Sequence, residues 1–144
     1  MAHSRLRRTI LLDTNVVSEL RRPERTHPNV AAWIVGHPPA SLVLSAMTVL
    51  ELEIGTRRIE RRDAPQGALL RAWLERVLVA FEGRILPFDT AVARQCAALH
   101  VPDPRPDRDA IIAAIARVHR LTLATRNVGD FAGMGVKLVD PWTG

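Results

Sequence analysis

The most restrictive feature of this sequence is a short apolar run, Ile10–Leu12, that ends abruptly at Asp13. An apolar run of this length, bounded by polar residues, is typical of a buried strand in a parallel sheet. Thr14 and Asn15 follow and can cap the helix-like pattern that comes next. Asp13 would then lie at the carboxyl end of a strand, where open parallel α/β sheets bind their ligands. The simpler alternative is that Asp13 only caps the helix, and this segment alone does not decide between the two.

Size and composition indicate one globular domain over residues 1–144. Because 47% of the residues are hydrophobic, the chain can bury a core. The single cysteine, Cys96, excludes an internal disulfide and a cysteine metal cluster, and it fits a reducing, cytoplasmic setting. The first apolar run is too short for a signal peptide or a membrane span.

The positive charge of the chain is carried almost entirely by arginine. The formal net charge is +5, and Lys137 is the only lysine. Guanidinium groups bind phosphate well, so a polyanionic partner is plausible, although an arginine-rich genome produces the same bias. The candidate contacts to such a partner are Arg126 and the run Arg57, Arg58, Arg61 and Arg62, for which a solvated helix face is the alternative.

Short apolar runs alternate with helical patterns along the rest of the chain. Further strands are expected at Leu42–Leu44, Ile85–Phe88, Leu121–Ala124 and Val136–Val139, with Pro87 indicating an edge or terminal position. Helices are expected at 30–35, from Thr48 to about Arg61, at Gly67–Glu82, at 91–99 after a cap at Asp89, and from Asp107 onward. This alternation predicts a layered α/β fold with a mainly parallel central sheet flanked by helices.

Four carboxylates occupy comparable places in this pattern. Asp13 follows the first strand, and Glu51 lies in the first turn of the helix after the second. Asp109 opens a later helix, and Asp130 follows the strand that ends at Ala124. In a parallel sheet these acids would share one edge, where they repel one another unless a cation joins them. Oxygen ligands without cysteine or paired histidine favour Mg²⁺ or Mn²⁺, which can activate water for phosphodiester hydrolysis.

Each of these acids also has a purely structural explanation. Thr48 and Glu51 have the spacing of a capping box. Asp109, like Asp107, can interact favourably with the dipole of the helix that it opens. Asp130 can be a turn residue. Such separate explanations do not account for the common placement of the four acids. Five neighbouring acids show no such placement and are expected to be solvated, namely Glu19, Glu53, Asp63, Asp103 and Asp140.

Four stretches resemble, in order, the acidic motifs of the PIN-domain ribonucleases. They are L-L-D-T-N-V-V-S-E-L, L-S-A-M-T-V-L-E-L-E-I-G, D-A-I-I-A-A-I-A and L-T-L-A-T-R-N-V-G-D-F. The likeness is closest to VapC-type toxins of the FitB-like branch, which this chain also resembles in S-E-L-R-R-P, I-L-P-F-D and the closing Pro141–Trp142.

The resemblance implies a role for each matching residue. Asp13, Glu51 and Asp109 match the acids that hold the metal, and Asp130 matches a fourth acid. Matching supporting polar residues are Asn15, Thr125 and Asn127. The register of D-A-I-I-A-A favours Asp109, and whether Asp107 shares its role stays open.

At the level of the whole chain, the resemblance implies a three-layer, Rossmann-like PIN domain that forms homodimers. It implies a Mg²⁺- or Mn²⁺-dependent endoribonuclease, the toxin of a type II toxin–antitoxin pair. A VapB-like antitoxin would block the site with its C-terminal segment.

Two alternatives belong to other functional classes. A phosphatase of the haloacid dehalogenase type also places an acid after its first strand, but it expects D-x-D where this chain has Asp13-Thr14-Asn15. A catalytically silent PIN-like module would bind RNA or a protein partner only. The complete set of four acids favours the ribonuclease.

Overall fold

The computed structural model describes residues 9–143. Within this range five strands form one sheet in the order β3-β2-β1-β4-β5, and every neighbouring pair is parallel. Their bounds are β1 (Ile10–Leu12), β2 (Leu42–Ser45), β3 (Ile85–Leu86), β4 (Thr122–Ala124) and β5 (Leu138–Val139). The predicted parallel α/β sheet is therefore confirmed. The edge or terminal position expected from Pro87 is also confirmed, because β3 ends just before this proline and pairs only with β2.

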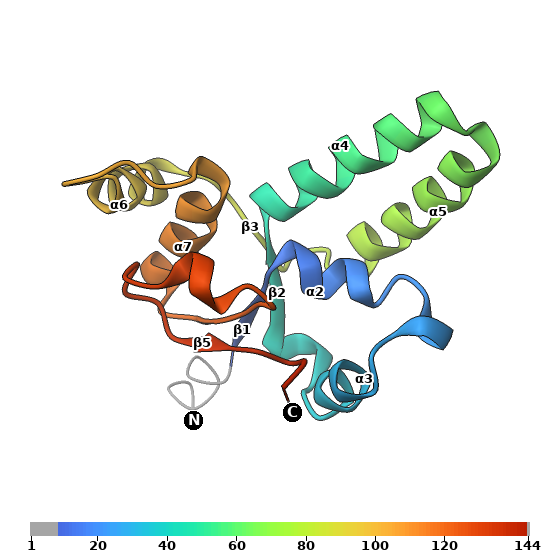
Figure 1. Cartoon of the computed structure of the whole chain (residues 1–144), viewed down its shortest axis with the longest axis horizontal. Coiled ribbons are helices and arrows are strands. Elements are labelled where there is room, and N and C mark those ends of the chain that lie inside the picture. The colour runs from blue at the N-terminus through green and yellow to red at the C-terminus, as the bar shows by residue number, and fades with distance from the viewer. Residues whose placement is uncertain (1–8, 144) are drawn as a thin grey trace.

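Helices connect the parallel strands (Figure 1). They are α2 (Thr14–Glu19), α3 (Pro28–Val35), α4 (Ala46–Arg62), α5 (Ala64–Ala80), α6 (Thr90–Leu99) and α7 (Asp107–His119). Three short 3₁₀ segments lie at Pro23–Arg25, Pro39–Ser41 and Val128–Phe131. None of the helices in residues 9–143 combines the length and the apolar character that crossing a membrane requires.

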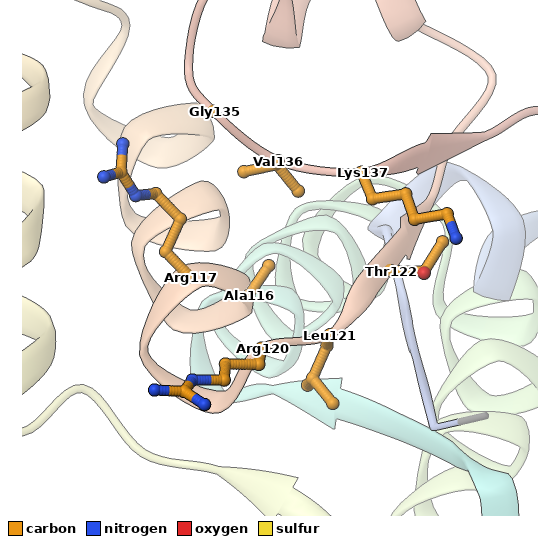
Figure 2. A pocket seen from close by; sticks show the side chains of 8 residues that line it. All are labelled: Ala116, Arg117, Arg120, Leu121, Thr122, Gly135, Val136 and Lys137. Carbon is orange, nitrogen blue, oxygen red and sulfur yellow. The ribbon is translucent and has the colours of Figure 1, made fainter. Parts of the chain in front are cut away.

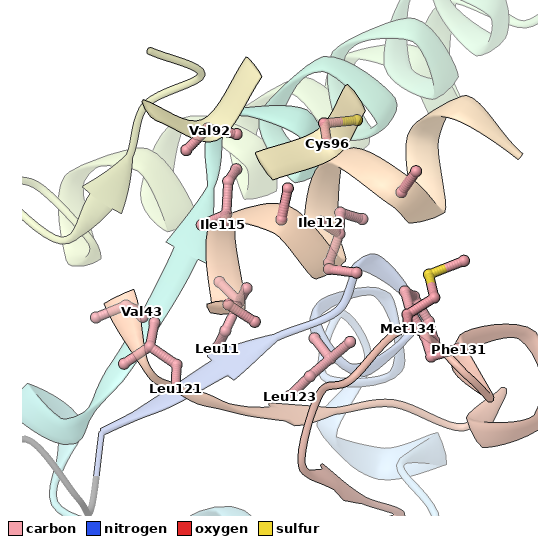
Figure 3. Close-up of a cluster of buried hydrophobic side chains, with 14 residues drawn as sticks. Leu11, Val43, Val92, Cys96, Ile112, Ile115, Leu121, Leu123, Phe131 and Met134 are labelled. Atoms are coloured by element: carbon pink, nitrogen blue, oxygen red, sulfur yellow. The ribbon is translucent and has the colours of Figure 1, made fainter. Parts of the chain in front are cut away.

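The sheet has a separate apolar layer on each face, because successive side chains of a strand point to opposite sides. Leu11 of β1 belongs to the layer formed with α6 and α7, which Figure 3 shows. Its neighbours Ile10 and Leu12 belong to the other layer, which includes side chains of α2, α4 and α5. The two layers and the sheet between them make up the predicted three-layer, Rossmann-like architecture.

Helices α4 and α5 form a hairpin that projects beyond the sheet (Figure 1). Asp63 joins them, since it ends α4 and its carboxylate accepts a hydrogen bond from the Gln66 N–H at the start of α5. Arg71 of α5 donates to Glu53 at 2.8 Å and to Glu60 at 2.9 Å, both on α4. The expectation of a solvated side chain is therefore wrong for Glu53, because its partner Arg71 is too distant in sequence for the pattern to reveal it. Asp63 is exposed as expected, and its carboxylate also caps α5.

The starts of both helices differ from the prediction. Helix α4 begins at Ala46 rather than Thr48, because the Ser45 hydroxyl accepts the Thr48 N–H at 3.0 Å and caps the helix. Glu51 therefore lies in the second turn and forms no capping box with Thr48. Helix α5 begins at Ala64 rather than Gly67, since a proline is tolerated in a first turn.

Two helical glycines give a matched test of how closely the hairpin is packed. A Cβ at Gly67 would lie 2.4 Å from the Glu60 Cα, whereas a Cβ at Gly55 would meet nothing within 4 Å. We expect Gly67→Ala to lower the free energy of unfolding by about 1–3 kcal/mol, since the two helices would have to separate. Gly55→Ala should raise it by about 0.5–1 kcal/mol, because alanine favours a helix. Urea unfolding of both variants measures this, and equal effects would contradict the close approach.

Candidate active site

Asp13 lies at the end of β1 and also caps α2. Its backbone N–H donates to the Ala124 carbonyl at 2.9 Å, and its Oδ1 accepts the Thr14 N–H at 2.8 Å. The residue is 6% exposed. The two explanations that the sequence left open are therefore compatible, because one oxygen serves as the cap while the other is available for different partners.

The second oxygen of Asp13 is held by Thr125, which follows β4, and by Asn15 in the first turn of α2. The Thr125 hydroxyl donates to Oδ2 at 2.7 Å, and the Asn15 amide approaches the same oxygen at 3.4 Å. The Asn127 backbone N–H donates to the Thr125 hydroxyl at 3.0 Å. Asn15 and Thr125 thus contact the acid directly, while Asn127 acts through its main chain. These bonds restrict the Asp13 carboxylate to one orientation.

Glu51 is positioned by a chain of hydroxyl groups. The Thr14 hydroxyl donates to Glu51 Oε1 at 2.9 Å and lies 2.9 Å from the Thr48 hydroxyl. The sequence pattern suggested only a capping role for Thr14, because the approach of α2 to α4 cannot be read from either segment alone. Arg108 forms a weak ion pair with Glu51 at 3.8 Å, the one contact of this kind to the four acids within residues 9–143.

The acids of α7 separate into an inward and an outward residue. Asp109 is half-buried, whereas the side chain of Asp107 is 90% exposed and lies 3.7 Å from His100. Helical geometry explains this, because residues two apart point to different sides of a helix. Asp107 therefore does not share the position of Asp109. Asp130, in the 3₁₀ segment after β4, is exposed at the margin of the cluster.

Burial and mutual repulsion make this cluster unfavourable for negative charge. The pKa of Asp13 is raised by burial, against the hydrogen bonds from Thr125 and Thr14, and the charges of Glu51 and Asp130 raise it further. The pKa of Asp109 is raised by burial and by the charges of Asp13 and Asp130. A bound cation would relieve this repulsion.

Three of the acids line one cleft of about 470 Å³ at the carboxyl edge of the sheet. Its lining comprises Asp13, Thr14, Asn15, Ser18, Glu19, Glu51, Asp109, Arg126, Asn127 and Trp142. Within the described residues, no three acid, histidine or cysteine side chains are arranged to ligate one ion together directly. The donor set nevertheless fits Mg²⁺ or Mn²⁺, because Mg²⁺ keeps several waters and commonly binds through one or two carboxylates. Trp142 and Glu19 were not predicted to belong to this site.

Two other cavities differ in chemistry. A mainly apolar groove of about 380 Å³ between α2, α4 and α5 adjoins the cleft and shares Thr14, Ser18 and Glu51 with it. A cavity of about 460 Å³ lies at the opposite edge of the sheet (Figure 2). Its cationic side chains, Arg117, Arg120 and Lys137, point in different directions and do not converge on one point. Among these three cavities, the convergent polar chemistry is therefore in the cleft with the acids.

Comparisons with known proteins agree with this geometry. Residues 10–135 match the model of the PIN domain. The chain is 39% identical over 140 residues to Toxin FitB of Neisseria gonorrhoeae, which covers 92% of this chain and 98% of that protein. It is 37% identical over 141 residues to VapC ribonuclease Y4jK of Sinorhizobium fredii, with 92% and 97% covered. The crystal structure of FitAcB from Neisseria gonorrhoeae has a TM-score of 0.84 and 38% identity over 93% of this chain and 99% of that chain.

The matched region runs from the first residue of β1 almost to β5, so it contains the whole acidic edge of the sheet. The relatives are matched over nearly their full lengths. The order of the strands, the position of the acids and these similarities agree with the resemblance seen in the sequence, and the chain belongs to the PIN domain family.

Proposed function

We propose that this protein is a Mg²⁺- or Mn²⁺-dependent endoribonuclease and the toxin of a type II toxin–antitoxin pair. The main support is the cleft at the carboxyl edge, where Asp13, Glu51 and Asp109 come together from three separate elements. Relatives that are named as a toxin and as a ribonuclease, and that match over nearly their whole length, support the same activity.

In this proposal each side chain of the cleft has a definite task. Asp13, Glu51 and Asp109 would hold the ion, directly or through its bound waters, and Asp130 adds negative charge beside them. When bound, the ion supplies a Lewis acid and lowers the pKa of water, which is the chemistry that phosphodiester hydrolysis needs. Thr125 and Thr14 hold Asp13 and Glu51 in place by hydrogen bonds of 2.7 and 2.9 Å, so the ligand oxygens are oriented before the ion arrives.

The proposed partner is a VapB-like antitoxin that occupies the apolar groove beside the cleft. Leu52, Leu70 and Trp73 contribute to its apolar lining, and Arg58 and Arg62 belong to the same lining. Because the groove and the cleft share Glu51, a segment bound in the groove can continue onto the acids. Arg58 and Arg62, which the sequence suggested as RNA contacts, would then face the antitoxin.

Family membership and metal binding distinguish the proposed nuclease from the two alternative functions. The phosphatase of the haloacid dehalogenase type has no support, because the chain belongs to the PIN domain family. A silent binding module stays an alternative, and metal binding by the acids discriminates between it and the nuclease.

Metal-dependent stabilisation tests the acid cluster directly. We expect Mg²⁺ or Mn²⁺, at roughly 100 times its Kd, to stabilise the wild type by about 2.7 kcal/mol, since it binds only the folded state. Asp13→Asn and Asp109→Asn should lose this effect and the cleavage of RNA. Asp107→Asn removes the same charge two residues away and should keep both. Thermal unfolding with metal or EDTA, followed by an RNA-cleavage assay, measures this, and cleavage by Asp13→Asn at the wild-type rate would refute the assignment.

The raised pKa of Asp13 predicts how stability depends on pH. Its ordinary value is 3.8, and a carboxyl with a higher pKa in the folded state destabilises the fold as it ionises. In EDTA, the free energy of unfolding of the wild type relative to Asp13→Asn should therefore fall as the pH rises from 3.8 through the raised pKa. Urea unfolding at a series of pH values measures this difference. A difference that does not change with pH contradicts the burial of an ionisable Asp13.

Thr125 gives a test of the support around the acids. Thr125→Val keeps the shape of the side chain but removes the hydroxyl that donates to Asp13 at 2.7 Å. Loss of such a partner typically lowers metal affinity about 10- to 100-fold. Thr125→Ser keeps the hydroxyl and should stay close to the wild type. Titration with Mn²⁺ compares the three proteins, and equal affinities would show that Thr125 does not orient Asp13.

A further inference from the structure

An aromatic ring and a guanidinium group lie together in the lining of the acidic cleft. The Arg126 guanidinium carbon is 5.3 Å from the centre of the Trp142 ring, and both residues line the cleft that contains Asp13 and Asp109. The two residues come from different elements, Arg126 from the segment after β4 and Trp142 from the segment after β5. Their association therefore exists only in the folded protein.

The Trp142 ring is supported by both its main chain and its packing. Its N–H donates to Asp140 Oδ1 at 2.9 Å, and its carbonyl accepts from the Asn29 side chain at 2.6 Å. The ring is only partly buried and packs against the apolar layer that contains Leu12 and Val16. One part of the residue is thus anchored in the core while another part lines the cleft, so the ring forms a supported platform at the wall of the cleft.

Arg126 is held at its main chain, and its charge is not neutralised by a nearby acid. Its N–H donates to Asn15 Oδ1 at 3.2 Å, which ties it to the residue that contacts Asp13. Within residues 9–143, its guanidinium forms no ion pair with a carboxylate, although the cleft beside it is acidic. A cation fixed at this place is suited to a phosphate group.

We propose that Arg126 and Trp142 form a subsite for an unpaired nucleotide of the RNA, next to the metal-binding acids. An aromatic ring stacks on an exposed base, and an arginine contacts the adjoining phosphate or extends the stack. A base inside a duplex cannot reach a ring at the side of a cleft, so the subsite selects single-stranded RNA. This inference rests on the proposed function, because it assumes that RNA reaches the acids through this cleft.

The test is binding of a short, fluorescein-labelled single-stranded RNA to the full-length protein in EDTA, where the proposed metal-dependent cleavage does not occur. Fluorescence anisotropy gives the Kd at several salt concentrations, with the matching RNA duplex for comparison. We expect Trp142→Leu to weaken single-strand binding about 5- to 100-fold, because stacking is lost while apolar bulk remains. Trp142→Phe should keep most of the affinity, since it keeps an aromatic ring.

The arginine is tested separately by its effect on salt dependence. Arg126→Gln should weaken binding and reduce the slope of log K against log salt by about 0.7, the value for one phosphate contact on a single strand. Arg126→Lys should keep this slope. Arg94→Gln is the control, because it removes an exposed charge from α6, outside the cleft. Any change that it causes in affinity should be the same for single strands and for duplexes.

The outcomes separate this inference from the proposed function. Unchanged single-strand binding in Trp142→Leu and Arg126→Gln overturns the subsite even if the protein cleaves RNA, and it is the result expected if the platform serves a protein partner. Weakened binding in both variants supports the subsite even if the wild type cleaves nothing with metal, in which case the proposed catalysis fails. Because Arg126 is exposed, its variants decide the question should Trp142→Leu not fold.

Discussion

The bond from the Thr125 hydroxyl to the Asp13 carboxylate joins the ends of the two adjacent strands β1 and β4. It partly offsets the cost of burying an acid that is only 6% exposed, and it places Asn15, Arg126 and Asn127 around one point. Parallel pairing is the condition for this arrangement, because it brings both strand ends to the same edge of the sheet. The acids, the proposed metal site and the nucleotide subsite all depend on that edge.

The cleft combines opposite electrostatic requirements within a small space. Its floor is acidic, and its acids have raised pKa values because of burial and mutual repulsion. Arg126 lines one side of it against Trp142, and Arg108, outside the lining, lies 3.8 Å from Glu51. Such an arrangement suits the proposed ligand, which carries both signs of charge: a cation that binds the acids, and an RNA phosphate that binds the cation and the arginine. The α4–α5 hairpin supplies Glu51 and one wall of the adjoining groove, so the hydrogen bonds of Arg71 between its two helices also support the site.

The fold could be predicted in outline because each strand and helix has a local signature. The apolar runs of β1, β2 and β4 and the helical pattern of α5 are visible without any tertiary contact. Helix starts were less predictable, as α4 shows. Both Ser45 and Thr48 can cap a helix, and the structure places the cap at Ser45, whose backbone is still extended and whose hydroxyl accepts the Thr48 N–H. Partners distant in sequence, such as Arg71 and Glu53, leave no local pattern at all.

The sequence by itself determined the family, the alternation of strands and helices, and the four acids that follow or open them, because these features are encoded in short contiguous motifs. The tertiary structure alone decided the partners and the burial of these acids. It turned Asp107 outward and Asp109 inward, gave Glu51 a threonine from another helix, and brought Trp142 from the end of the chain to Arg126. The physical reason is that motifs specify local geometry, whereas contacts between side chains far apart in sequence depend on how the whole sheet and its helices pack.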